Sequence, residues 1–350
     1  MRRLFTAGAF LVALGATTLP AADAPQSAHV PGLSYRLEPV AEGVFCAIAS
    51  GAPYYVSNSA VIVGDDSVLV VDTGAGPNEA AVLREAIRAL TPLPVRYVVD
   101  THFHFDHAFG HQAFPEALVI GHEATRALLG PDARGGRTVA GYMTGLPAQI
   151  ENARAEAEKE GSPDKRAELM QRAEALRAYQ AELAALVPAP PQMTFDHRVT
   201  LWLGRREVQL LHLGRGHTAG DVVVYLPQQR VVCTGDLFNG YIGYMGDAYV
   251  DEWADTLDRL AALDFETVIP GHGTPFKGKE AIAPVQACLR DLWRQAQSLK
   301  REGVPAKDAA QRIDLRNHAG RFPRLGQIGF EAPAVQRIYE VSDERAARAR

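Results

Sequence analysis

Thr101-His102-Phe103-His104-Phe105-Asp106-His107 closely follows the apolar segment 95–99 and predicts a metal site at the end of a strand. Imidazole and carboxylate groups together suit zinc and related divalent metals. Residues two apart in an extended segment point to the same side, so His102 and His104 can hold one metal. Asp106 and His107 lie where the chain turns towards a helix, so they point elsewhere and can hold a second metal. A solvated polar loop is the alternative, and the density of metal-capable side chains disfavours it.

Three later segments repeat one arrangement: a short apolar strand, a glycine and a ligand-type residue. The pairs are Gly216-His217, Gly235-Asp236 and Gly271-His272. Glycine lets the backbone turn sharply and approach a bound ion. Ligands at the ends of successive strands can converge on one edge of a sheet, where α/β proteins usually place their sites. We therefore expect these residues to join the first segment around the metals.

The motifs in this order resemble the metallo-β-lactamase superfamily of hydrolases. They are T-H-F-H-F-D-H, G-H-T-A-G-D, C-T-G-D and P-G-H-G, preceded by V-V-D-T-G at 70–74. The resemblance covers about residues 43–279, and it is far more specific for the fold than for the substrate. It implies an α/β fold, a four-layer αβ/βα sandwich with the metals at one edge.

The resemblance also implies a role for each ligand-type residue. The ligands of the first metal correspond to His102, His104 and His217, and those of the second to Asp106, His107 and His272. Asp236 corresponds to the carboxylate that bridges the two metals. Asp72 matches the carboxylate that supports the ligand loop, and such support fixes ligand orientation and metal affinity.

Other polar residues near these motifs have two interpretations each. Asp100 either supports the ligands in the same way or caps a turn, and His111 is assigned a structural role in preference to a metal-binding one. The glycine- and aromatic-rich loop 237–249 follows Asp236, and Asn239, Tyr241 and Tyr244 can reach over the metals from it. A tyrosine hydroxyl there could donate to an oxyanion. Aromatic packing of a tight loop is the alternative.

The composition is that of an ordinary globular protein with enough length for one large core. The chain has 350 residues, of which 47% are hydrophobic and 22% charged. A net charge of -5 without a long basic run disfavours nucleic-acid binding. Only three cysteines occur, too few for a disulfide scaffold, and Cys233 is predicted to pack in the core. Phosphate-binding glycine loops and serine-nucleophile motifs are missing from the sequence.

Residues 1–24 predict an export signal that is removed from the mature protein. A basic start at Met1-Arg2-Arg3 precedes a short apolar stretch and small-residue cleavage sites. The apolar stretch is short for a membrane span, so no span is expected after signal removal. A periplasmic or secreted location follows, while the general and twin-arginine export routes both stay open. Residues 25–350 are expected to form a single domain.

Residues 131–191 are rich in Ala, Glu and Arg and predict a helical hairpin inserted between two halves of the fold. Helices are expected at 150–160 and 165–187, separated by Gly161-Ser162-Pro163. The apolar stripe of the second helix is interpreted as packing against the domain, with a lid or a dimer contact as the alternative. The second half is expected to begin at Met193 with a strand over 193–203. The oligomeric state stays open.

The resemblance implies an exported dinuclear hydrolase with two zinc ions per chain, iron or manganese being alternative metals. A metal-bound hydroxide would attack an ester, thioester, lactone or lactam bond of a small-molecule substrate. Asp106, Asp236, Tyr241 and Tyr244 form the predicted catalytic set.

Three alternatives to this hydrolase remain. One is β-lactamase activity, disfavoured because Asp236 stands where the cysteine-containing lactamases of the family carry a thiolate. The others are an iron-dependent persulfide dioxygenase and a metal-binding accessory protein of a periplasmic quinoprotein or sulfur-oxidation system.

Overall fold

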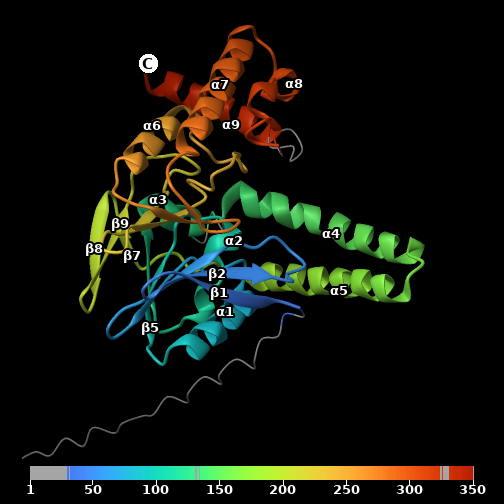
Figure 1. Cartoon of the computed structure of the whole chain (residues 1–350). Helices are drawn as coiled ribbons and strands as arrows, with labels where there is room; N and C mark the ends of the chain where they lie inside the picture. Colours follow the sequence, from blue (N-terminus) through green and yellow to red (C-terminus); the bar gives the residue numbers. More distant parts are fainter. Residues whose placement is uncertain are drawn as a thin grey trace, which may run out of the picture.

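The computed structural model describes residues 30, 32–130, 132–133, 135–323, 325 and 331–349. Two β-sheets face each other, and helices cover their outer faces (Figure 1). The predicted four-layer sandwich is therefore confirmed. The predicted export signal, residues 1–24, lies outside the described residues. None of the helices in the described part of the chain combines the length and apolarity needed to cross a bilayer.

The first sheet has seven strands, in spatial order from β1 to β7. They are β1 (Ser34–Ala41), β2 (Val44–Ser50), β3 (Ser59–Val63), β4 (Val68–Val71), β5 (Val95–Val99), β6 (Leu118–His122) and β7 (Met193–Phe195). Strands β1 to β4 pair antiparallel, whereas β4 to β7 pair parallel. The helices that connect the parallel strands include α1 (Pro77–Leu90), α2 (Phe105–Ala108) and α3 (Glu123–Leu129), and the short 3-10 turn η1 (His111–Ala113) follows α2.

The second sheet has six strands in the order β13-β12-β11-β10-β9-β8. They are β8 (Arg198–Leu203), β9 (Arg206–Leu211), β10 (Val223–Leu226), β11 (Val231–Gly235), β12 (Thr267–Pro270) and β13 (Phe276–Lys277). Its outer face is covered by helices. The covering elements are α6 (Val250–Ala261), α7 (Ile282–Arg301), α8 (Ala306–Arg312), η2 (Arg316–His318) and α9 (Glu331–Arg348).

The main core lies between the two sheets. Ile62 and Leu69 from the first sheet meet Leu210 and Val224 from the second, and all four side chains are fully buried. The predicted core position of Cys233 is confirmed, and all three cysteines are free and buried. Strand β4 is buried on both faces, which explains why its sequence is continuously apolar rather than alternating.

A helical hairpin of α4 (Gly136–Lys159) and α5 (Pro163–Ala185) joins β6 to β7 through α3, and its two helices lie side by side and project from the sandwich (Figure 1). Its base packs against the domain through Leu176 and Tyr179. The predicted start of the first helix at Ile150 is wrong, because α4 begins at Gly136 and runs through Pro147. Proline and glycine disfavour helix interiors, and burial of Leu146 and Ile150 overrides this local preference.

The predicted single strand over 193–203 is also wrong. The strand ends before Asp196. The chain then passes from the first sheet, where β7 pairs with β6, to the second sheet, where β8 pairs with β9. Phe195 and Leu203 nevertheless contribute to the same core between the sheets. A local apolar pattern reports burial in that core but does not reveal which sheet supplies the hydrogen bonds.

Candidate metal centre

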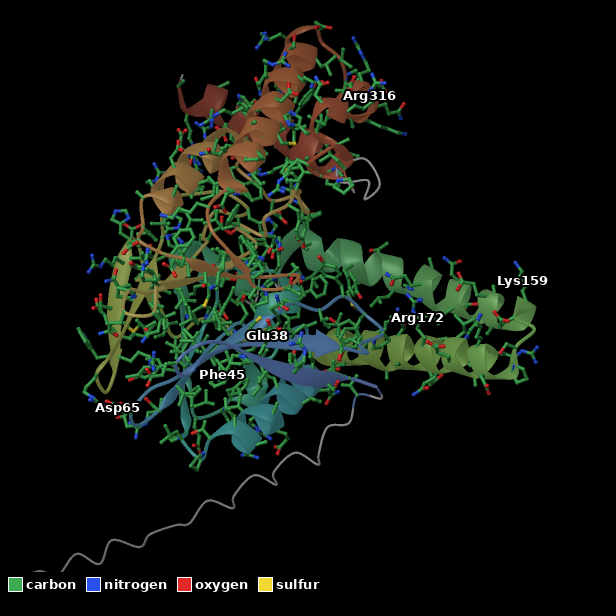
Figure 2. The ribbon with its side chains drawn as sticks, in the orientation of Figure 1. Glu38, Phe45, Asp65, Lys159, Arg172 and Arg316 are labelled. Atoms are coloured by element: carbon green, nitrogen blue, oxygen red, sulfur yellow. The ribbon has the colours of Figure 1, made fainter. Side chains whose placement is uncertain are left out.

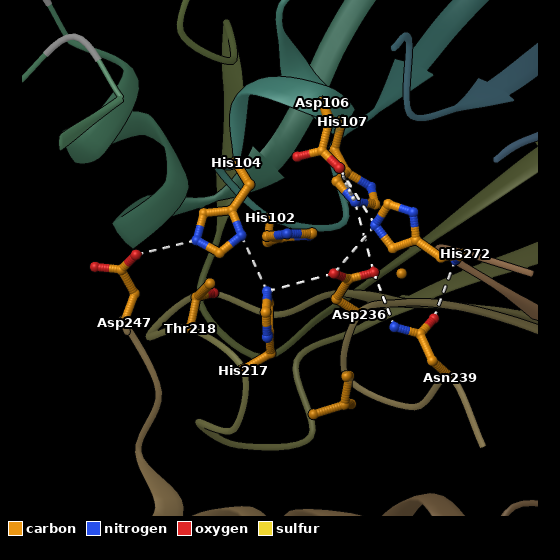
Figure 3. A network of polar contacts seen from close by, with 12 residues as sticks. His102, His104, Asp106, His107, His217, Thr218, Asp236, Asn239, Asp247 and His272 are labelled. Atoms are coloured by element: carbon orange, nitrogen blue, oxygen red, sulfur yellow. Dashed lines mark hydrogen bonds and ion pairs between the residues drawn. The ribbon is translucent and has the colours of Figure 1, made fainter. Parts of the chain in front are cut away.

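Seven predicted ligand residues from four segments of the chain converge at one edge of the sandwich, as Figure 3 shows. His102 and His104 follow β5, and Asp106 and His107 lie in the single turn of α2. The remaining three follow strands of the second sheet, and they are His217 after β9, Asp236 after β11 and His272 after β12. Since β11 and β12 run parallel, their carboxyl ends bring two of these side chains to the same edge.

His102, His104 and His217 form the first group of potential ligands. Their ligand atoms lie within 4.8 Å of one another, and Nε2 of His217 is 3.0 Å from Nδ1 of His104. Burial lowers the pKa of His102 well below its usual value. Burial and the nearby His104 lower the pKa of His217 to about 3. The rings of His102 and His217 are therefore neutral at neutral pH and available to a metal.

Asp106, His107 and His272 form the second group. Oδ2 of Asp106 lies 3.2 Å from Nε2 of His272 and 3.5 Å from Nε2 of His107. Asp236 stands between the two groups, with Oδ2 3.6 Å from Nε2 of His217 and 3.3 Å from Nε2 of His272. Its position matches the bridging role predicted from the sequence.

The outer nitrogens of four imidazoles face hydrogen-bond acceptors, which decides the tautomers. Nδ1 of His102 donates to the Thr101 hydroxyl (3.0 Å), which itself donates to Asp72. The other three rings also donate to nearby oxygens. Nε2 of His104 donates to Asp247 (3.1 Å), and Nδ1 of His107 donates to Asp72 (2.7 Å). Nδ1 of His272 donates to the Val56 carbonyl (3.1 Å). The inner nitrogen of each neutral ring therefore presents a lone pair to the centre.

The residues fit a divalent metal because their inner atoms otherwise lack partners. Nε2 of His102, His107 and His272 and Oδ2 of Asp106 are buried without a hydrogen bond to any described residue. A buried polar atom without a partner costs about 1–3 kcal/mol. Metal ions would satisfy all four atoms together, and the imidazole and carboxylate donors suit zinc, manganese or iron.

Asp72 supports the ligand loop through hydrogen bonds, as predicted. Its carboxylate accepts from the backbone N–H and the hydroxyl of Thr101, both at 2.8 Å, and from His107. The backbone of Asp72 is left-handed, with φ 59°, which is uncommon for a residue other than glycine. Backbone strain of this kind is often kept where a side chain must be aimed at a functional site.

Asp100 and His111 pair with each other away from the centre. Nε2 of His111 donates to Asp100 at 2.7 Å, and Nδ1 donates to the Ala189 carbonyl at 2.7 Å. Both nitrogens of His111 are therefore occupied, in agreement with a structural role. Asp100 makes no hydrogen bond to a candidate ligand within the described part of the chain, so its support of the centre is indirect.

Two polar residues of the loop after β11 also hold the ligands. Nδ2 of Asn239 donates to Asp236 (3.1 Å), and its carbonyl oxygen accepts from the backbone N–H of His272 (3.1 Å), so it links the bridging carboxylate to a second-group ligand. Asp247 accepts from His104 and from the hydroxyl of Thr138 on α4. Asp247 was not predicted from the sequence, because no motif marks it and only its position near Tyr244 could have suggested it.

The two predicted catalytic tyrosines lie at the surface of this loop. Tyr241 is 38% exposed and lines a cavity of about 440 Å³ together with Asn239 and His272. Tyr244 is 36% exposed, and its ring lies edge-on to His104 with centroids 5.8 Å apart. Both side chains flank the ligand cluster, and their catalytic role stays a prediction.

We expect Asp247→Asn to lower metal affinity and activity by about 10–100-fold. Burial acts against its charge, but His104, Thr138 and Arg137 lower the pKa of Asp247 to about 2, so it orients His104 as a carboxylate. Metal titration and initial rates would measure the loss. Asp255→Asn, at an exposed carboxylate on α6, is the matched control, and equal behaviour of the two variants would contradict the role.

Metal binding at pH 7 should release protons. Burial lowers the pKa of His107, but Asp106, Asp72 and Asp236 outweigh it and raise the value to about 9. Asp236 and Asp106 likewise overcome burial and raise the pKa of His272 well above its usual value. Metal must displace these protons, so affinity is expected to rise with pH towards 9. Calorimetric titration in two buffers of different protonation enthalpy measures the release, and a heat independent of buffer would contradict it.

The sequence model of the metallo-beta-lactamase superfamily matches residues 53–272, which include every candidate ligand. The chain belongs to this superfamily. The predicted activity of a metal-dependent hydrolase is consistent with this membership.

One curated relative is the linear primary-alkylsulfatase of Pseudomonas sp. (strain ATCC 19151). It is 26% identical over 305 residues, which are 80% of this chain and 54% of the relative. The chain thus spans about half the length of this relative.

Two solved structures share the fold. The metallo-beta-lactamase from Pontibacter korlensis has a TM-score of 0.51 and 21% identity, and the match covers 73% of this chain and 99% of that one. The DIM-1 metallo-beta-lactamase has a TM-score of 0.51 and 20% identity over 73% of this chain and 97% of that one. At this level of identity the similarity shows a superfamily fold and says nothing of the substrate.

Proposed function

We propose that this superfamily member is a dinuclear zinc hydrolase that cleaves an ester, thioester, lactone or lactam bond of a small molecule. The proposal is carried by the ligand cluster, in which Nε2 of His102, His107 and His272 and Oδ2 of Asp106 are buried without a hydrogen bond to any described residue. Bound zinc ions would supply a nucleophile at neutral pH by lowering the pKa of water. The N-terminal segment 1–24 further supports a periplasmic or secreted location.

The chain itself contributes orientation and charge. Asp236 is held by Asn239 between the two ligand groups, so its two oxygens are placed for both metals. Although burial acts to raise it, His272, His107 and His217 keep the pKa of Asp236 well below its usual value. The carboxylate is therefore ionised at neutral pH, where its charge would offset part of the positive charge of bound metals.

A second candidate is hydrolysis of a primary alkyl sulfate ester. It is favoured by the similarity to a linear primary-alkylsulfatase over 80% of this chain. The same ligand cluster would serve this reaction, because sulfate and carbonyl esters both develop negative charge on oxygen. β-Lactamase activity has weaker support, since the solved lactamases share the fold at 20–21% identity.

The test combines metal analysis of the purified protein with a substrate panel. We expect about two zinc ions per chain and hydrolysis of a p-nitrophenyl ester, a thioester or a lactone that is lost on chelation and restored by zinc. Cleavage of an alkyl sulfate alone would favour the second candidate. One iron ion per chain without zinc, together with persulfide oxidation, would overturn the hydrolase proposal.

We expect Tyr241→Phe or Tyr244→Phe to lower kcat by about 10²–10³-fold while metal content stays unchanged. Both rings flank the ligand cluster, where a hydroxyl can donate to charge that develops on the substrate. Steady-state kinetics on the best substrate would measure the effect. If neither variant changes kcat or KM, the tyrosines are packing residues of the loop.

A further inference from the structure

A large groove lies between the helical hairpin and the segment 51–55. Its volume is about 1110 Å³, which is at the upper end of what small-molecule sites occupy. We name it the hairpin groove and define it by its lining on three segments. These are Gly51–Tyr55, Tyr142 with Gln149 on α4, and a row on α5 that includes Leu169, Arg172 and Ala175.

The hairpin groove begins beside the second group of metal ligands. Tyr55 lines it and places its ring against His272, with centroids 4.8 Å apart. Tyr142 lines it as well, and its ring centroid lies 4.4 Å from that of Phe105. Phe105 immediately precedes the candidate ligand Asp106. A substrate whose reacting bond lies at the metals can therefore extend its remaining part into the groove.

The walls near the centre are aromatic and apolar. Tyr54 is buried against Tyr179 in a stack with centroids 3.7 Å apart, so this wall is rigid. Ala52, Pro53 and Leu169 continue the apolar surface. The charged side chains of the lining all lie on the hairpin, where Lys165, Glu168 and Arg172 (Figure 2) are exposed and Glu160 is half-buried. Such a surface gains free energy by taking apolar area out of water rather than by binding an ion.

We propose that the hairpin groove binds the apolar chain of the substrate and gives the enzyme a preference for long unbranched acyl or alkyl groups. This inference rests on the proposed hydrolase function, because it places the reacting bond of the same substrate at the metal centre. It also assigns the hairpin a role beyond the packing of its base. A groove that is open along one side binds chains of different length, so affinity should rise with each added methylene group.

Direct binding tests the groove separately from catalysis. Titration calorimetry on metal-free protein would compare dodecanoate with butanoate as probes. Dodecanoate should bind at least about a hundredfold more tightly, since each buried methylene favours binding by up to about fourfold. Ala175→Trp fills the groove and should weaken dodecanoate binding at least tenfold, whereas Ala181→Trp, at an exposed position on α5 outside the lining, should not.

A second variant, Leu169→Asp, tests the groove independently in case Ala175→Trp does not fold. Circular dichroism checks that both variants are folded. Equal binding of dodecanoate by both groove variants and Ala181→Trp, or equal binding of the two probes, would overturn the proposal. On metal-loaded protein, kcat/KM should rise from butanoyl to dodecanoyl esters, and only the groove variants should flatten this series. Hydrolysis without chain-length dependence contradicts the groove alone, while dodecanoate binding without any hydrolysis contradicts the proposed function alone.

Discussion

Replacing Asp236 with alanine is expected to abolish hydrolysis and to reduce the metal content of both sites. The carboxylate lies within 3.3–3.6 Å of ring nitrogens from both ligand groups, so its loss removes a donor from each. The effect should exceed the roughly 10–100-fold that loss of a supporting residue costs. Metal analysis of the purified variant and its rate on the best substrate measure the two losses.

The matched control is Asp264→Ala, which removes an exposed carboxylate that pairs with Arg230 at the surface and contacts none of the described candidate ligands. It should keep both metals and the full rate. An Asp236→Ala variant that also keeps two metals and the full rate would show that the carboxylate does not bridge.

Asp72→Asn is expected to lower metal affinity by about 10–100-fold, although Asp72 is not itself a candidate metal ligand. The carboxylate accepts three hydrogen bonds, from both donors of Thr101 and from His107, and an amide cannot accept all of them. Asparagine tolerates the left-handed backbone at this position, so the substitution removes the charge and one acceptor oxygen without backbone strain. Competition with a chromophoric chelator would measure the affinity.

Asp72→Ala adds a second effect to the same comparison. Alanine is strained at φ 59°, and the three buried donors lose their acceptor, at a cost of about 1–3 kcal/mol for each one left unpaired. The melting temperature of metal-free Asp72→Ala should therefore be lower than that of metal-free Asp72→Asn and of the metal-free parent chain. Metal affinity in Asp72→Asn equal to that of the parent would mean that Thr101 and His107 are held without this carboxylate.

The position of the ligand cluster could be predicted from the sequence because each ligand follows a short strand. Segments 68–71 and 231–233 are continuously apolar, which is the pattern of strands buried on both faces. Parallel strands bring their carboxyl ends to one edge, so side chains placed there along the sequence meet in space. Order along the chain and strand length were sufficient for this part of the centre.

The supports of the cluster and the course of the hairpin depended on the tertiary structure. Asp247 reaches His104 because the loop after β11 folds back over the centre, and Thr138 meets it because α4 begins at Gly136 instead of Ile150. The strand expected over 193–203 divides between two sheets that share one core. A local sequence pattern shows which positions are buried and how they are spaced. It carries no information about the segment that packs against them. The seven candidate ligands were thus determined by the sequence alone, whereas the residues that orient them and the groove beside them arise from contacts between segments far apart in the chain.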